Sequence, residues 1–236
     1  MVKLKPITSL PNDPLELRRL KVVLATFGIN IIAVALLTLA PWSDWKTGLA
    51  LNLFDNLLLL AFVALYHDRL LLRLMIFGLA VGFAELAADA WLVVYTRTLD
   101  YSIGGGPMLW RSPIWMPIAW EIVAVQFSCL GLWLRDRLGA PGLAVIGLLG
   151  AINIPYYEEM AKRIHWWQYS GCRMISNTPY YIIFGELLIA VAFTLLARRL
   201  RRDSFAPVLP AGVIGGAAIF AAYAVAYGIT DGLWKK

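Results

Sequence analysis

Seven long apolar segments run through this chain of 236 residues, and they constrain its fold more than any other feature. A helix needs about 20 mostly apolar residues to span a bilayer. Hydrophobic residues make up 60% of the chain and charged residues only 15%, whereas soluble domains are about half apolar and a quarter charged. We therefore expect an all-α polytopic membrane protein with seven transmembrane helices in one bundle. The segments cover residues 21–41, 48–66, 70–96, 113–134, 139–160, 177–197 and 208–230.

Charge placement predicts the topology. The first twenty residues are polar and broken by prolines, without the apolar run of a signal peptide. We expect residues 1–20 to form a cytoplasmic N-terminal arm and residues 21–236 to form one transmembrane domain. With the N-terminus inside, 13 Lys and Arg residues fall on inner segments and 8 on outer ones. This bias favours a cytoplasmic N-terminus and an outer C-terminus. We expect the membrane to be the inner membrane of a bacterium.

The net charge of +6 does not indicate nucleic-acid binding, because the basic residues flank the apolar segments and form no single patch. Membrane lipid is the expected surrounding. Two longer loops, 97–112 and 161–176, should both lie on the outer side. Gly212 and Gly216 form a GxxxG spacing, which lets helices approach closely. This spacing is a packing signal, and it leaves a homo-oligomer open.

Acidic residues within or at the edge of the apolar segments are the main functional candidates. An ionisable side chain at bilayer depth costs about 2.5–3.5 kcal/mol on insertion scales, so it needs a reason to be there. The candidates are Asp55, Glu85, Asp89, Glu121, Glu158, Glu159 and Glu186.

The depths of these acids predict a shared chamber. Four of them lie eight or nine residues from an outer helix end, about 12 Å below the boundary at 1.5 Å per residue. These four are Asp55, Asp89, Glu121 and Glu186. Glu158 and Glu159 lie nearer the mouth, and Glu85 lies one turn deeper than Asp89 on the same helix face.

No lysine or arginine falls at the depth of this layer, so we expect the carboxyls to lack basic partners and some to be protonated. The alternative is that individual acids only pair with arginine or bond backbone carbonyls, and so hold helices together. That alternative is favoured slightly for Asp55, which shares a helix face with Asn52 and Asn56.

Aromatic residues crowd the same outer half, as in the stretch "INIPYYEEMAKRIHWWQY". An interfacial belt of Trp and Tyr explains several of them. The rest suit an apolar cavity in which a carboxylic acid protonates an alkene and aromatic faces stabilise the carbocation. The expected substrate-binding residues are Trp115, Trp120, Tyr157, Trp166, Trp167 and Tyr181.

The stretch "GPMLWRSPIWMPIAWE" at residues 106–121 resembles a run in the membrane carotenoid hydratases, which add water across a terminal double bond of an acyclic carotenoid. The family pattern has Gly, Pro, Leu, Pro, Pro, Ala and Trp in this order and spacing. A second stretch is similar, but it departs where chemistry is expected. Glu158 stands in place of an aspartate, Trp167 and Tyr169 replace a W-x-W pair, and Glu186 replaces a tryptophan.

The resemblance covers about a third of the chain and implies a cofactor-independent hydratase acting on a lipophilic isoprenoid. More distantly, the chain is similar in size and acid content to the small seven-helix membrane terpene cyclases. A hydratase and a cyclase differ in whether water or a second double bond captures the cation, so lyase-type and isomerase-type outcomes both stay open.

Glu121, Glu158 and Glu186 are the candidate proton donors, and Asp89, Glu85 and Glu159 are candidates to tune or relay. We expect no cofactor and no metal, because the chain has two distant histidines and no phosphate-binding or Asp-rich diphosphate motif. The competing function is a transporter or binding protein for an organic cation or another lipophilic small molecule. A purely structural role leaves the acidic layer unexplained.

Overall fold

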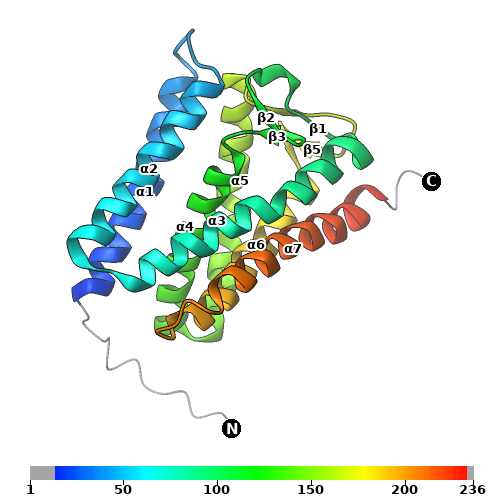
Figure 1. Cartoon of the computed structure of the whole chain (residues 1–236). Coiled ribbons are helices and arrows are strands. Elements are labelled where there is room, and N and C mark those ends of the chain that lie inside the picture. The colour runs from blue at the N-terminus through cyan, green and yellow to red at the C-terminus, as the bar shows by residue number, and fades with distance from the viewer. Residues whose placement is uncertain (1–13, 233–236) are drawn as a thin grey trace.

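The computed structural model describes residues 14–232. Within them, seven helices are long and apolar enough to cross a membrane, so the predicted fold class is confirmed: an all-α bundle and an integral membrane protein (Figure 1). The helices are α1 (Pro14–Leu37), α2 (Trp45–Tyr66), α3 (Arg69–Ala90), α4 (Met116–Leu138), α5 (Ala140–Ile164), α6 (Tyr180–Ala197) and α7 (Val208–Tyr227).

Helix ends follow local sequence signals. Asp44 precedes α2 and accepts the Lys46 backbone N–H at 2.8 Å, and Asp68 precedes α3 and accepts that of Leu71 at 2.9 Å, as N-cap residues do. The helix α1 begins at Pro14, seven residues before the predicted apolar segment, because hydropathy detects only the apolar part of a helix. Residues 14–20 of the expected arm are therefore helical, and residues 1–13 lie outside the described residues.

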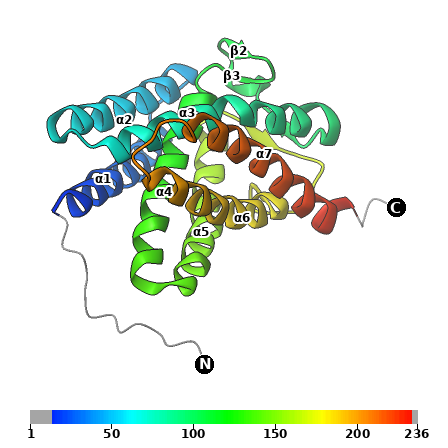
Figure 2. The same cartoon turned by 60° about the horizontal axis from the view of Figure 1, so that its bottom comes forward.

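The centre of the bundle is formed by α3, which packs along both α4 and α7, while α5 packs along α6 (Figures 1 and 2). Glycines permit the close approach of α7 to α3. A Cβ built on Gly212 would lie 2.4 Å from Ala80 Cβ, and one on Gly216 would lie 2.4 Å from Ala84 Cβ. The GxxxG spacing is thus used for packing within the chain.

Three two-stranded antiparallel pairs close one end of the bundle. β1 (Leu99–Asp100) pairs with β4 (Gln168–Tyr169), and this pairing joins the two long loops. The other two pairs are hairpins within single loops: β2 (Met108–Leu109) with β3 (Ser112–Pro113), and β5 (Met174–Ile175) with β6 (Thr178–Pro179). Both long loops therefore lie at the same end, as predicted (Figure 1).

Arginine ion pairs lie at the opposite end. Arg19 makes a bidentate pair with Asp68, at 2.6 and 3.0 Å. Asp203 follows α6 and accepts from Arg73 at 2.6 Å and from Arg69 at 3.1 Å. Its bond with Arg73, followed by the charge of Arg69, lowers the pKa of Asp203. These pairs tie the ends of α1, α3 and α6 together.

Candidate functional site

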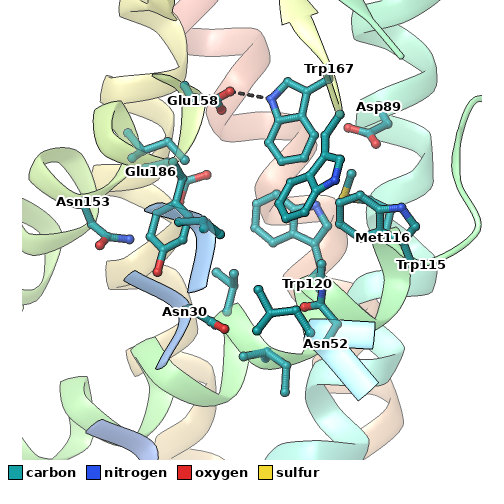
Figure 3. A pocket seen from close by; sticks show the side chains of 18 of the residues that line it. Asn30, Asn52, Asp89, Trp115, Met116, Trp120, Asn153, Glu158, Trp167 and Glu186 are labelled. Atoms are coloured by element: carbon teal, nitrogen blue, oxygen red, sulfur yellow. Dashed lines mark hydrogen bonds between the residues drawn. The ribbon is translucent and has the colours of Figure 1, made fainter. Parts of the chain in front are cut away.

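A cavity of about 150 Å³ lies inside the bundle near the strand-covered end. Side chains from all seven helices and from both long loops line it. Figure 3 shows carboxyl groups toward one end of the cavity, tryptophan rings across its middle, and the amides of Asn30 and Asn52 toward the other end. Its lining is therefore mixed, with an acidic part, an aromatic part and an amide part.

Three buried acids from three helices line this cavity: Asp89 of α3, Glu158 of α5 and Glu186 of α6. Each side chain is buried, with its residue 4% exposed. The three helices are joined through shared neighbours, because α3 packs along α4 and α7, and α6 packs along α4, α5 and α7. The prediction that separate helices contribute acids to a common chamber is confirmed for these three.

Each of the three acids accepts a hydrogen bond from a tyrosine hydroxyl. Tyr101 donates to Asp89 at 2.7 Å, Tyr169 to Glu158 at 3.2 Å, and Tyr223 to Glu186 at 2.6 Å. Two further donors add to this set, because Ser112 Oγ donates to Asp89 at 2.8 Å and Trp167 Nε1 to Glu158 at 2.5 Å. The donors hold each carboxyl in one orientation at the cavity wall.

No lysine, arginine or histidine is among the residues found to line the cavity. The ion pairs of the described residues involve other acids. Three neighbouring carboxyls without a cation cannot all be ionised at low free-energy cost in an apolar interior. The arrangement therefore suits groups that hold and transfer protons. No group of three His, Cys, Asp or Glu within residues 14–232 is placed to hold a metal ion.

Glu85 lies behind the lining, one helical turn from Asp89 on α3. It is fully buried, and neither of its carboxyl oxygens has a hydrogen-bond partner. It lies within electrostatic range of Asp89 and Glu186. This position keeps the predicted relay role of Glu85 open, although the side chain does not reach the cavity itself.

Glu159 requires a correction, because it faces away from the cavity. Its carboxyl pairs with Arg163 at 2.8 Å and accepts from Ser176 at 2.9 Å and from the Asn177 amide. Successive residues on a helix point about 100° apart, at 3.6 residues per turn. With Glu158 directed inward, Glu159 is directed to the loop surface.

Asp55 and Glu121 share the predicted depth but do not line the cavity. Asp55 is fully buried against Asn30 of α1. The carboxyl of Glu121 lies beside the amide of Asn56, whose nitrogen comes within 2.9 Å of it when the amide is turned. Both acids thus contact asparagines of neighbouring helices. For Asp55 the contact is with an asparagine, whereas the packing role favoured from the sequence named arginine or a backbone carbonyl as the partner.

Five of the six predicted substrate-binding aromatics line the cavity: Trp115, Trp120, Tyr157, Trp166 and Trp167. The sixth, Tyr181, is fully buried outside it, where its hydroxyl bonds Thr98 at 2.7 Å. Trp115 contacts both loop tryptophans, with ring centroids 5.3 Å from Trp166 and 6.1 Å from Trp167. These rings form an apolar, π-rich wall beside the carboxyls.

The loop strands place two of the acid-binding tyrosines. Tyr169 ends β4 and Tyr101 follows β1, so the pairing of these strands brings both hydroxyls over the acids. Burial raises the pKa of the Tyr101 phenol well above 10.0, and the nearby carboxyl of Asp89 raises it further. Burial and the neighbouring Glu158 raise the pKa of Tyr169 in the same way. Both phenols therefore remain donors at neutral pH.

Sequence reasoning missed several lining residues. Tyr223 lies in the apolar helix α7. Its only signal in the sequence was a hydroxyl group among apolar and small residues. Asn30 and Asn153 are amides inside apolar segments, which is itself a signal, because unpaired polar groups are costly in a membrane. Asn153 lies within the stretch "INIPYYEEMAKRIHWWQY", which also contains Glu158. Gln126 lines the cavity and donates to Thr26 Oγ1 at 3.0 Å.

Comparison with curated proteins and with solved structures gave no match for this chain. One family model matches, described as a domain of unknown function, DUF6989, and it covers residues 86–230. The matched segment is more than half of the chain, and it contains Asp89, Glu158, Glu186 and the lining tryptophans, while Glu85, Asn30 and Asn52 precede it. The chain is a membrane protein with seven apolar helices and with buried acids around an aromatic cavity. It belongs to the DUF6989 family.

Proposed function

We propose that this protein is a membrane enzyme that protonates an isoprenoid double bond to give a hydrated or cyclised product. The observation that carries the proposal is the convergence of Asp89, Glu158 and Glu186 on one tryptophan-lined cavity with no basic residue found in its lining. Such a site offers a proton donor, an apolar space for a hydrocarbon and π faces for a cation.

The proposed reaction needs no redox partner. One protonated carboxyl transfers its proton to an alkene carbon, which leaves a carboxylate and a tertiary carbocation. Water or a second double bond of the substrate then forms the new bond to the cationic carbon. A proton is lost from the resulting oxonium or cation, and the carboxylate accepts it. The second and third carboxyls supply further places for that proton.

The size of the cavity limits what it can hold. At about 150 Å³ it is smaller than the cavities of about 300–1,000 Å³ that enclose drug-sized ligands. A long isoprenoid would place one reacting end in the cavity and leave the rest in the surrounding lipid. The resemblance to carotenoid hydratases and the more distant likeness to membrane terpene cyclases both support a substrate of this shape.

Single substitutions of the cavity acids test the proposal. Asp89→Asn, Glu158→Gln and Glu186→Gln are expressed in a host that makes an acyclic carotenoid or a prenylated aromatic, and the products are quantified by mass spectrometry. We expect at least one variant to lose about 10²-fold or more of product formation, as removal of a general acid does. Glu159→Gln is the matched control, because it changes the neighbouring residue on the same helix and should keep activity. Unchanged product in all three variants would rule out the proposal.

A second candidate function is binding or transport of an organic cation. The observation that favours it is the same set of rings and carboxyls, since a quaternary ammonium group binds well between aromatic faces and acids. Reconstituted vesicles separate the two functions. Uptake of a quaternary amine with coupled proton movement supports transport, whereas alkene turnover without uptake supports the enzyme.

We also propose that the arginine-rich end faces the cytoplasm of a bacterial inner membrane and that the strand-covered end faces outward. The positions of Arg19, Arg69, Arg73, Arg137 and Arg201 at one end support this orientation. A reporter fused to the C-terminus tests it: periplasmic alkaline phosphatase should be active there and a cytoplasmic fluorescent protein should not. Crosslinking in the membrane tests for a homo-oligomer.

A further inference from the structure

The geometry points to a subsite for an uncharged oxygen, a hydroxyl or carbonyl of the isoprenoid, formed by cavity asparagines from separate helices. Asn30 of α1, Asn52 of α2 and Asn153 of α5 all line the cavity. Figure 3 shows Asn30 and Asn52 on the side away from Glu158 and Asp89. None of these amides takes part in the acid–tyrosine pairs, so the proposed proton transfer leaves them without a role.

The hydrogen-bonding capacity of these amides is largely unused within the protein. The Asn52 amide nitrogen donates to the Gly48 carbonyl at 2.8 Å, and no described group bonds its oxygen. The Asn153 side chain makes no hydrogen bond with any described residue. The Asn30 side chain contacts Asp55 through its amide, but its oxygen is buried without a donor. A membrane interior has no bulk water to bond such groups, so a ligand oxygen is the partner that fits them.

The chemistry of the amides selects the ligand class. An amide offers both a donor and an acceptor, which matches a hydroxyl, and its donor alone matches a carbonyl. A phosphate or diphosphate ester would need cations, and the residues found to line the cavity include none, while three acids stand nearby. The substrate assigned to this cavity is therefore an isoprenoid alcohol, ketone or quinone, and its diphosphate ester is excluded.

Binding of matched probes tests this subsite. The probes are geraniol, the hydrocarbon 2,6-dimethylocta-2,6-diene, in which hydrogen replaces the hydroxyl group of geraniol, and geranyl diphosphate. Binding to the full chain in lipid nanodiscs is followed by tryptophan emission, since four tryptophans line the cavity. We compare variants in identical nanodiscs, so partitioning of each probe into lipid cancels from the ratio of variant to wild-type affinity.

We expect Asn153→Leu and Asn52→Leu to weaken geraniol binding about tenfold, the effect of a lost hydrogen bond, and to leave hydrocarbon binding nearly unchanged. Asn153→Ser keeps a hydrogen-bonding group and should retain part of the preference. Asn56→Leu is the control on α2, because Asn56 lies one turn from Asn52 and does not line the cavity. Geranyl diphosphate should bind no better than the hydrocarbon.

Equal losses for geraniol and hydrocarbon would contradict the subsite, as would no binding of either probe to folded wild-type protein, or a preference for the diphosphate. An unchanged geraniol preference in both leucine variants would mean that the amides bind water only, which also overturns it. The subsite rests on the proposed function for the isoprenoid skeleton of its ligand. The experiments nevertheless distinguish failure of the subsite from failure of the proposed enzyme activity. If wild type forms no product and the geraniol preference still depends on the asparagines, the subsite stands without the enzyme. If wild type forms product and the geraniol preference does not depend on the asparagines, the enzyme stands without the subsite.

Discussion

At the scale of single residues, each cavity acid is held by a tyrosine hydroxyl. A phenol that donates to a carboxyl fixes its rotamer, and a buried acid that loses this donor is left with an unpaired oxygen. Tyr223 is the clearest case, because it is buried on α7 and it supplies the only hydrogen bond that the described residues make to Glu186. Proton transfer from Glu186 should therefore depend on a residue that need not touch the substrate.

Replacement of Tyr223 by Phe tests this dependence. Loss of the hydroxyl should destabilise the fold by about 1–3 kcal/mol, because one oxygen of Glu186 becomes unpaired in the interior. Product formation should fall about tenfold in the folded fraction. Thermal unfolding in detergent and product assays measure the two effects. Tyr95→Phe is the control, since Tyr95 is 76% exposed on the outside of the bundle. Equal behaviour of the two variants would contradict the positioning role of Tyr223.

Tyr101 predicts how stability depends on alkaline pH. Its pKa is raised in the folded protein, chiefly by burial and then by Asp89, so the folded state keeps a proton that the unfolded chain releases near pH 10. The contribution to stability is complete below pH 10 and is lost as the pH rises toward the folded-state pKa. Thermal unfolding between pH 8 and pH 11 should show a steeper fall for wild type than for Tyr101→Phe. Parallel curves would exclude this role of Tyr101.

At the scale of elements, the contact between α3 and α7 depends on glycine. A Cβ on Gly216 would lie 2.4 Å from Ala84 Cβ and 2.8 Å from the Ala84 backbone carbonyl carbon, so the two helices would have to separate. The same helix α3 carries Asp89 and Glu85, and α7 carries Tyr223. A separation of these helices would therefore also disturb the pairing of Tyr223 with Glu186, which links this packing contact to the site.

The variant Gly216→Ala should lower the free energy of unfolding by about 1–3 kcal/mol, as overpacking of an interior does. Gly228→Ala is the matched control just beyond the end of α7, because a Cβ there meets nothing within 4 Å. It should be neutral or slightly stabilising, since alanine is the better helix former. Thermal unfolding of both variants in the same detergent measures the difference. Equal stability would show that the contact is looser than described.

At the scale of the whole molecule, depth along a helix can be derived from sequence, whereas rotation and neighbours cannot. Hydropathy gave the seven helices, and counting residues gave the common depth of the acids. Asp55 and Glu121 share that depth with Asp89 and Glu186, yet Asp55 contacts Asn30, Glu121 contacts Asn56, and neither acid lines the cavity. Tyr101 and Tyr169 reach the acids through a strand pair of two residues per strand, too short to be recognised in the sequence.

Deuterium transfer from solvent tests the central claim most directly, because a proton delivered by a carboxyl in exchange with water becomes a carbon–hydrogen bond of the product. Purified protein is incubated in D₂O with an acyclic carotenoid and, separately, with a prenylated aromatic, and the products are analysed by mass spectrometry and NMR. The account predicts one carbon-bound deuterium at a former alkene position, with loss of the labelled product when Asp89, Glu158 and Glu186 are replaced together. A product without carbon-bound deuterium, or labelled product that survives the triple replacement, would contradict it.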